Sequence, residues 1–182
     1  MKKTEFFLIQ LEGFFYLNYP TLLNCFQDSL ETPFAFENTS LNLLYSWANG
    51  MELDTDLPLD KMAFCSFGYF LSFEEGTSYE KSFNEEDYFV NKNLFPIVAS
   101  RTGDFLLVDS MKTNGKVYLY SPSLLIIEPI IVYENIERFV ITMYECFSQF
   151  AYSYDNDFFL VVNDELEKAI TIKLNPSSEF WD

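Results

Sequence analysis

The fold is decided by residues 94–132, which read LFPIVASRTGDFLLVDSMKTNGKVYLYSPSLLIIEPIIV. Four short apolar runs in this stretch, at 95–99, 105–109, 117–120 and 124–132, are rich in β-branched and aromatic residues. Such residues are enriched in strands. Short apolar runs that are separated by polar, glycine-containing segments predict strands joined by hairpins.

Two turn sequences connect the predicted strands. Residues 101–104 read RTGD and residues 113–116 read TNGK. The pair Asn114-Gly115 suits a type I′ turn, because both central residues of that turn have positive φ. A tight two-residue hairpin is therefore expected at this second turn.

Outside the central stretch, the apolar pattern predicts both helices and further strands. Helical spacing predicts helices over residues 16–30 and 135–150, whereas aromatic or apolar runs predict strands at 63–73, 158–162 and 169–174. Helices before and after a run of hairpin-linked strands indicate an α+β protein. We expect a single domain with a twisted, mainly antiparallel sheet, flanked by N-terminal helices and by the helix near residues 135–150.

A further helix is expected over residues 39–47. Thr39 or Ser40 is a suitable N-cap, because a hydroxyl oxygen can accept a hydrogen bond from the first turn of a helix. Asn49-Gly50 then ends the helix, since both residues tolerate the left-handed backbone conformation of a C-cap. We assign this pair no function beyond the helix end.

The composition restricts the class of partner. The 182 residues fit one domain, and they carry 28 acidic against 11 basic residues, a formal net charge of -17. Nucleic acid and anionic membranes both need clustered Lys and Arg for binding, so neither is an expected partner. A basic protein would be attracted instead, and the alternative reading of the charge is that it only keeps the protein soluble. Most of the 21 Phe and 12 Tyr residues are expected in the core, and so large a number favours some aromatic side chains at a contact surface.

The acidic residues are unevenly distributed. Residues 4–60 contain nine acidic residues and no basic one. A second acidic run follows within residues 73–87, and it supplies our candidate partner-binding residues. They are Glu74, Glu75, Glu85, Glu86 and Asp87. A solvated helix surface produces similar runs, so that alternative remains open.

The residue types do not favour catalysis. The chain contains no histidine, which removes the commonest general base and a common ligand for transition metals. It also contains no glycine-rich phosphate-binding motif. Catalysis by carboxylates alone remains an alternative, as in glycosidases. We expect a protein that is not an enzyme and that has no cofactor and no catalytic residues.

Two groups of aspartates are candidate calcium ligands. Asp54, Asp56 and Asp60 form one group, and Asp155 and Asp157 form the other. Neither has the glycine at the sixth position and the glutamate at the twelfth position of an EF-hand loop. Turn residues and solvated charges explain them better, and no metal site is expected.

The cysteines and the hydropathy pattern bear on location. Cys25, Cys65 and Cys146 are far apart in apolar sequence, so we expect buried thiols and no disulfide framework. No run of about 18 apolar residues occurs, so no transmembrane helix is expected. The apolar run at 6–9 is bounded by polar residues and lacks a small-residue cleavage site, unlike a signal peptide. We expect a cytoplasmic protein.

An ordered set of motifs resembles the SUKH superfamily. The run LNLLYSWANG at 41–50 resembles that superfamily's helix ending in W-x-N-G. LFPI at 94–97 with GDFLLVD at 103–109 is similar to its fPI…GD-x-x-x-hD stretch, and KVYLY at 116–120 is similar to its gkVyhy strand. The helix at 135–150 stands in the place of its closing helix. The resemblance covers residues 20–152 and leaves 153–182 as a C-terminal extension of a single domain, 1–182.

The resemblance implies a function as well as a fold. Members are mostly bacterial immunity proteins, which bind a toxin in the cell that produces it, and some are regulatory scaffolds. It carries no catalytic residues, and its fold-motif positions are Trp47, Asn49, Gly50, Gly103, Asp104 and Asp109. From their surroundings, we expect Trp47 to pack in the core, Asp104 to organise its turn and Asp109 to cap its strand.

Charge, missing catalytic groups and resemblance together predict an immunity protein. It would neutralise a cognate toxin by stoichiometric binding, and a basic nuclease is the toxin class that best suits so acidic a binder. An intracellular regulatory or scaffold protein is the alternative. The sequence does not specify the oligomeric state.

Overall fold

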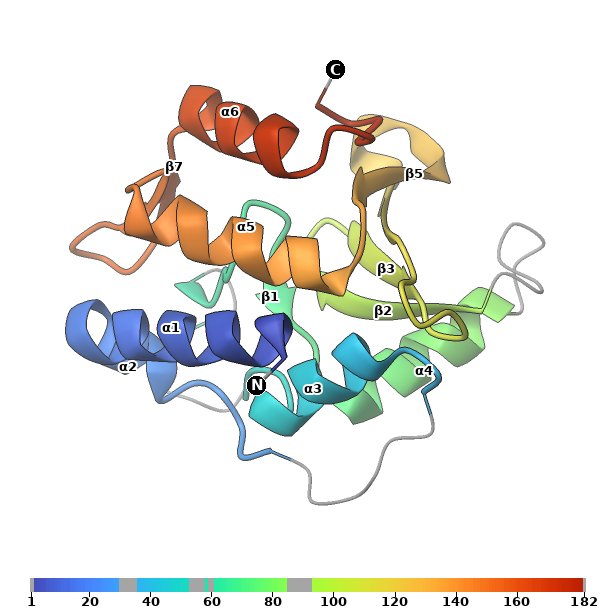
Figure 1. The fold of residues 1–182 in the computed structure, drawn as a ribbon, viewed down its shortest axis with the longest axis horizontal. Helices are drawn as coiled ribbons and strands as arrows, with labels where there is room; N and C mark the ends of the chain where they lie inside the picture. Colours follow the sequence, from blue (N-terminus) through green and yellow to red (C-terminus); the bar gives the residue numbers. More distant parts are fainter. Residues whose placement is uncertain (1, 30–35, 53–57, 59–60, 85–92, 182) are drawn as a thin grey trace.

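An antiparallel sheet lies at the centre of the protein (Figure 1), in a computed structural model that describes residues 2–29, 36–52, 58, 61–84 and 93–181. Within these residues the sheet has five strands in the order β1-β2-β3-β4-β5. The strands are β1 (Tyr69–Phe70), β2 (Leu94–Ala99), β3 (Phe105–Asp109), β4 (Val117–Ser121) and β5 (Ile126–Tyr133). Each strand from β2 onward pairs antiparallel with the strand before it. The α+β class and the antiparallel sheet predicted from residues 94–132 are confirmed.

Helices flank the sheet. They are α1 (Lys3–Asn18), α2 (Pro20–Leu23), α3 (Thr39–Trp47), α4 (Phe73–Asn84), α5 (Ile136–Ser148) and α6 (Asp164–Leu174). A short 3-10 turn, η2 (Pro122–Leu124), precedes β5, and a separate hairpin is formed by β6 (Tyr152–Tyr154) and β7 (Leu160–Val162). In Figure 1, α5 lies between α1 and α6 beside the sheet.

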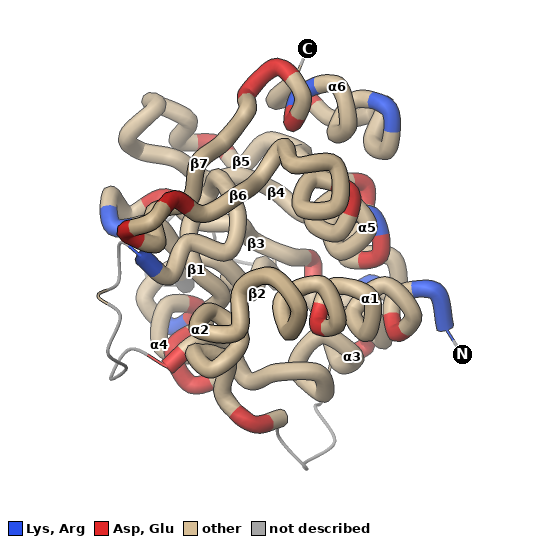
Figure 2. The backbone as a smooth tube through the Cα atoms, turned by 90° about the vertical axis from the view of Figure 1, so that its left-hand side faces the viewer, with Lys and Arg blue, Asp and Glu red and all other residues tan. Residues whose placement is uncertain are grey.

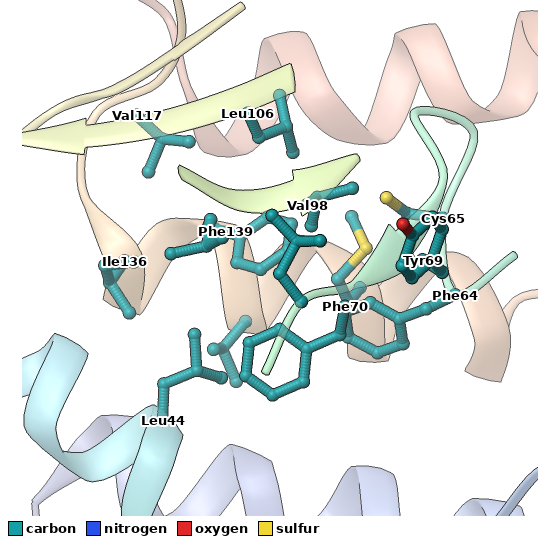
Figure 3. Close-up of a cluster of buried hydrophobic side chains, with 14 of the residues drawn as sticks. Leu44, Phe64, Cys65, Tyr69, Phe70, Val98, Leu106, Val117, Ile136 and Phe139 are labelled. Atoms are coloured by element: carbon teal, nitrogen blue, oxygen red, sulfur yellow. The ribbon is translucent and has the colours of Figure 1, made fainter. Parts of the chain in front are cut away.

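The core fills the space between the sheet and α5. Val98, Leu106 and Val117, from three adjacent strands, point toward Ile136 and Phe139 of α5 (Figure 3). All five side chains are buried. Burial of a side chain of this size stabilises a fold by about 1.5–3 kcal/mol, so this layer fixes which face of the sheet α5 covers.

Helix α4 covers the opposite face of the sheet. Tyr79 and Phe83 contact the ring of Phe105 on β3, with ring centroids 4.9 and 5.0 Å apart. Gly76 lies against Phe95 of β2, where an added Cβ would approach the ring to 2.6 Å. Helices on both faces explain why every residue of β2 and β3 is buried.

The N-terminal helix differs from the prediction. The chain forms α1 and then the short α2, whereas a helix over 16–30 was expected. Proline disfavours helical geometry in the residue before it, and Pro20 accordingly follows Tyr19, where α1 ends. Helix α1 carries apolar residues of its own on every side. The helical spacing of its buried residues, Leu8, Leu11 and Phe15, therefore does not stand out in the sequence.

Helix α4 replaces the end of a predicted strand. Residues 63–73 were expected to form one strand, but only β1 does so, and Phe73 begins α4. A capping box sets this start: Glu75 N donates to Ser72 Oγ at 3.2 Å, and Ser72 N donates to Glu75 Oε2 at 2.8 Å. The Ser-x-x-Glu spacing is visible in the sequence and was missed.

The connection between β3 and β4 is not a type I′ turn. Neither Asn114 nor Gly115 has positive φ, and residues 110–116 form a longer loop. Gly115 is needed for another reason, because an added Cβ would lie 2.0 Å from Asp109 O. Close backbone approach, not hairpin geometry, therefore explains this glycine.

The C-terminal region also differs in part. The predicted strand at 158–162 is found as β7, but residues 169–174 belong to α6. Asn163 accepts a hydrogen bond from Leu166 N at 3.1 Å and caps this helix. Helix α3 is capped in the same way by Asn38, not by Thr39 or Ser40, and α5 begins after its cap, Asn135, close to the predicted start. The three cysteines are buried thiols, as expected.

Candidate functional site

The Asn49-Gly50 pair does not end α3 as a left-handed cap, because α3 ends at Trp47 and its C-cap, Ala48, has an extended backbone. Asn49 Oδ1 accepts a hydrogen bond from Phe73 N at 2.9 Å, which caps the start of α4. Asn49 Nδ2 donates to Gln27 Oε1 and to Glu74 Oε2, both at 3.2 Å. Gly50 has a φ of +77°. The pair therefore joins α3, the segment after α2 and α4, which corrects the expectation of a helix end alone.

The structure describes only two of the five residues of the predicted acidic surface, Glu74 and Glu75. Glu74 and Glu75 lie in the first turn of α4, where negative charge is favourable to the helix dipole. Glu74 accepts from Asn49, and Glu75 takes part in the capping box. Both carboxylates thus help to start a helix, and their role in partner contact stays a prediction. Glu85, Glu86 and Asp87 lie outside the described residues.

Asp104 organises its turn, as expected. Its Oδ2 accepts hydrogen bonds from Thr102 Oγ1 at 2.5 Å and Ser123 Oγ at 2.8 Å. Its Oδ1 accepts from Ser121 Oγ at 2.7 Å. Partial burial acts to raise the pKa of Asp104, but the hydrogen bonds outweigh burial and lower it. The carboxylate ties the β2–β3 turn, which includes Gly103 with a φ of +82°, to the end of β4.

Asp109 and Trp47 also have places in the fold. Asp109, at the end of β3, is buried, accepts from Met111 N at 3.3 Å and forms an ion pair of 2.7 Å with Lys112. It therefore caps its strand, as predicted. Trp47 packs on Phe26 with ring centroids 5.0 Å apart, and its Nε1 donates to Glu12 at 3.3 Å. The ring lies at the border of the core and not within it.

The outer face of α1 carries exposed apolar side chains that the sequence pattern did not predict. Its apolar members are three, seven and one residues apart, and with Gly13 between them the positions follow at steps of three and four, which places them on one face. They are Phe6, Ile9, Tyr16 and Leu17, with 40%, 50%, 70% and 79% of their surface exposed. Gly13 lies among them with nothing within 4 Å of an added Cβ, so it leaves a notch in the ridge. We call this set the α1 outer face.

Negative charge borders the α1 outer face. Glu5 and Glu12 are exposed one helical step from Ile9 and Tyr16, on the side toward α3. The basic residues of the helix region, Lys2 and Lys3, are confined to the end at the N-terminus (Figure 2). The opposite border packs on α5 through aromatic contacts and is not available. The exposed surface is therefore an apolar ridge with an acidic edge.

A second unusual group is the buried carboxylate of Glu167 on α6. The residue is 2% exposed. Its Oε1 accepts hydrogen bonds from Ser66 Oγ at 2.5 Å and from the hydroxyl of Tyr152. Burial raises the pKa of Glu167, and the two hydrogen bonds compensate only in part. The sequence offered no signal for this contact, because it joins residues 66, 152 and 167.

A pH-dependent stability is expected from Glu167. Because its pKa is higher in the folded state, the folded protein holds the proton to higher pH, and its contribution to stability is lost as the pH rises above about 4.5. Glu167→Gln keeps an oxygen acceptor without the charge. Measured by urea unfolding, this variant should gain stability relative to the native protein between pH 4.5 and 7, by about 1.4 kcal/mol for each unit of pKa difference. A difference that stays constant with pH would show that folding does not change this pKa.

Metal binding and membrane insertion find no support in the part of the chain that the structure describes. There, no three cysteine or acidic side chains come together as a metal site would require. Asp155 Oδ1 accepts from Asp157 N and Phe159 N, both at 2.9 Å, as expected of a turn residue. Residues 54 and 56 and residue 60 lie outside the described segments. The described helices include none with the length and apolar character needed to cross a bilayer.

Comparison with known proteins does not assign the chain to a family. No protein-family model matches the chain, and no curated protein is significantly similar to it.

Proposed function

We propose that this protein is an immunity protein, which binds a cognate basic toxin and neutralises it by one-to-one contact. The observation that carries the proposal is the α1 outer face, an exposed apolar ridge with an acidic edge. Exposed apolar groups that are contiguous and rimmed by charge are typical of protein-binding surfaces. The absence of histidine from the sequence agrees with binding rather than catalysis.

The spacing of the ridge suits a recognised mode of binding. Side chains at steps of three and four residues along one face of a helix are the anchors with which amphipathic helices occupy apolar grooves. Ile9, Tyr16 and Leu17 would enter such a groove, and the Gly13 notch would admit a side chain from the partner. Aromatic anchors such as Tyr16 contribute most when water is excluded around them.

Charge selects the partner. Glu5 and Glu12 border the ridge, and the whole chain has a formal net charge of -17. A second copy of the chain would bring like charges together, so self-association through this face is disfavoured. A basic surface would be attracted, and its association would be faster at low salt. The basic active-site cleft of a nuclease is a surface of this kind.

The resemblance over residues 20–152 supports immunity rather than binding in general. Regulatory scaffolds of the same superfamily also bind proteins, so the identity of the partner separates the two functions. A toxin encoded beside this gene is the partner that immunity requires.

Co-expression with the product of the adjacent gene tests the proposal. In a cell that this product kills, we expect the protein to restore growth and to co-elute with it as a 1:1 complex on gel filtration. The control is a frame-shifted copy of the gene, which should not protect. Killing that continues with every neighbouring product, together with recovery of housekeeping proteins from a pull-down, would favour the scaffold function.

A further inference from the structure

A cleft of about 450 Å³ lies on a different part of the surface from the α1 outer face. It is formed where the start of α6, the segment 66–67, the β2–β3 turn and residues 180–181 meet. These segments are remote in the sequence, and the fold alone brings them together. Glu167, described above as a buried carboxylate, lines this cleft.

Only one of the two carboxylate oxygens of Glu167 accepts a hydrogen bond from a described residue. Oε1 accepts the hydrogen bonds of Ser66 and Tyr152, whereas Oε2 accepts from no residue that the structure describes. A carboxylate that is almost fully removed from solvent loses much of its hydration, and a cation or a donor beside it would stabilise its charged form. A ligand group in the cleft would supply what the described residues do not.

The polar wall of the cleft offers hydrogen-bond acceptors. The hydroxyls of Thr102, Ser121 and Ser123 donate to Asp104, at 2.5, 2.7 and 2.8 Å. Because each hydroxyl hydrogen is directed at this carboxylate, only oxygen lone pairs remain for a ligand. The accessible ones belong to Thr102 and Ser123, which are exposed, since Ser121 is buried and its Oγ already accepts from Leu124 N at 3.3 Å. A sugar would need donors as well as acceptors from the wall. A ligand that mainly donates fits this wall better, although Trp181 Nε1, on the opposite wall, is a buried donor with no partner among the described residues.

The charge and the aromatic side chains of the lining point the same way. Asp104, Asp164 and Glu167 line the cleft, and the described lining includes no Lys or Arg. Phe67, Phe180 and Trp181 form its other wall, with ring centroids 4.8 to 6.3 Å apart. Aromatic rings attract organic cations, and a concave surface with one sign of charge concentrates the opposite sign.

We propose that this cleft binds a guanidinium or alkylammonium group. Guanidinium carries five N–H donors and no acceptor, which complements a wall of hydroxyl lone pairs and the free oxygen of Glu167. The group can belong to a free organic cation or to an Arg or Lys side chain of a protein. The site does not depend on the α1 outer face, so either proposal can fail without the other.

Binding of capped amino acids by calorimetry tests the cleft. Nα-acetyl-arginine amide is the probe, and Nα-acetyl-citrulline amide, which has a neutral urea of nearly the same shape, is the matched control. We expect saturable 1:1 binding of the arginine compound, with affinity at least tenfold above that of citrulline. n-Butylguanidine, a guanidinium compound of the same single charge without peptide groups, distinguishes the sources: equal affinity indicates a free cation, and weaker binding indicates a protein side chain.

Two variants locate the binding. Glu167→Gln should lower the affinity at least tenfold, whereas Glu165→Gln, which removes the same charge from the exposed side of α6, should change it less than twofold. Asp164→Asn, at an exposed position of the lining, should weaken binding severalfold and serves if Glu167→Gln does not fold. No saturation by the arginine compound, equal binding of citrulline, or full affinity in both cleft variants would overturn the proposal.

Discussion

Replacement of Ile9 and Leu17 by lysine is expected to weaken toxin binding at least 100-fold and to abolish protection in the co-expression assay. Each substitution removes an exposed apolar anchor and adds a charge that repels a basic partner. Loss of a central anchor costs about 2 kcal/mol or more, and each 1.4 kcal/mol changes the affinity tenfold. Two such losses therefore suffice for the expected effect.

The fold should tolerate these changes. Ile9 and Leu17 are 50% and 79% exposed, and surface substitutions usually alter stability by no more than about 0.5 kcal/mol. Urea unfolding of the double variant checks this point. The matched control is Ile172→Lys, which replaces an exposed apolar residue of α6 and adds the same charge. It should protect cells as the native protein does.

Salt gives an independent measure of the acidic edge. The association rate of the native protein with the toxin should fall as salt rises, because exposed charges are screened beyond about 8 Å at physiological ionic strength. Glu5→Gln should reduce this salt dependence. If the double lysine variant binds the toxin as tightly as the native protein, or if Ile172→Lys loses as much affinity, the α1 outer face is not the contact surface.

The central sheet was readable from the sequence because its signals are local. Strands at 95–99, 105–109 and 117–120 are short apolar runs bounded by turn residues, and the sheet pairs consecutive strands. The helix after Asn135 was equally clear, since its apolar residues keep a helical period and its cap precedes it. Where element type depended on a single cap, as at Ser72 and Asn163, the prediction was wrong.

The sites were harder to predict than the sheet, for a physical reason. Apolar residues on all sides of α1 do not show which side faces the core, and that depends on the position of α5. The cleft depends on tertiary structure still more, because Ser66, Asp104 and Glu167 meet only in the folded chain. Roles that stay within a turn or a strand end, such as those of Asp104 and Asp109, were predicted correctly.

Among three glycine-to-alanine replacements, the one at Gly50 is expected to lower the stability most. With φ at +77°, a side chain there is strained, and an added Cβ would lie 2.2 Å from Ser72 N and 2.4 Å from Leu71 C. Leu71 and Ser72 connect β1 to the start of α4, so the backbone of this connection would have to shift. Left-handed strain costs about 1–2 kcal/mol and overpacking about 1–3 kcal/mol more. Gly50→Ala should therefore lose about 3 kcal/mol or more.

Two other glycines separate the causes of this loss. Gly103 has a φ of +82° with open space around it, so Gly103→Ala should show the strain alone, a loss of about 1–2 kcal/mol. Gly13 lies in α1 with open space and ordinary helical φ, so Gly13→Ala should gain about 0.5–1 kcal/mol. Urea midpoints at a constant m-value measure all three. If Gly50→Ala loses no more stability than Gly103→Ala, close packing adds nothing to the strain at Gly50. The backbone of residues 71 and 72 then does not approach Gly50 as closely as described, and the connection between α3 and α4 is not tightly packed.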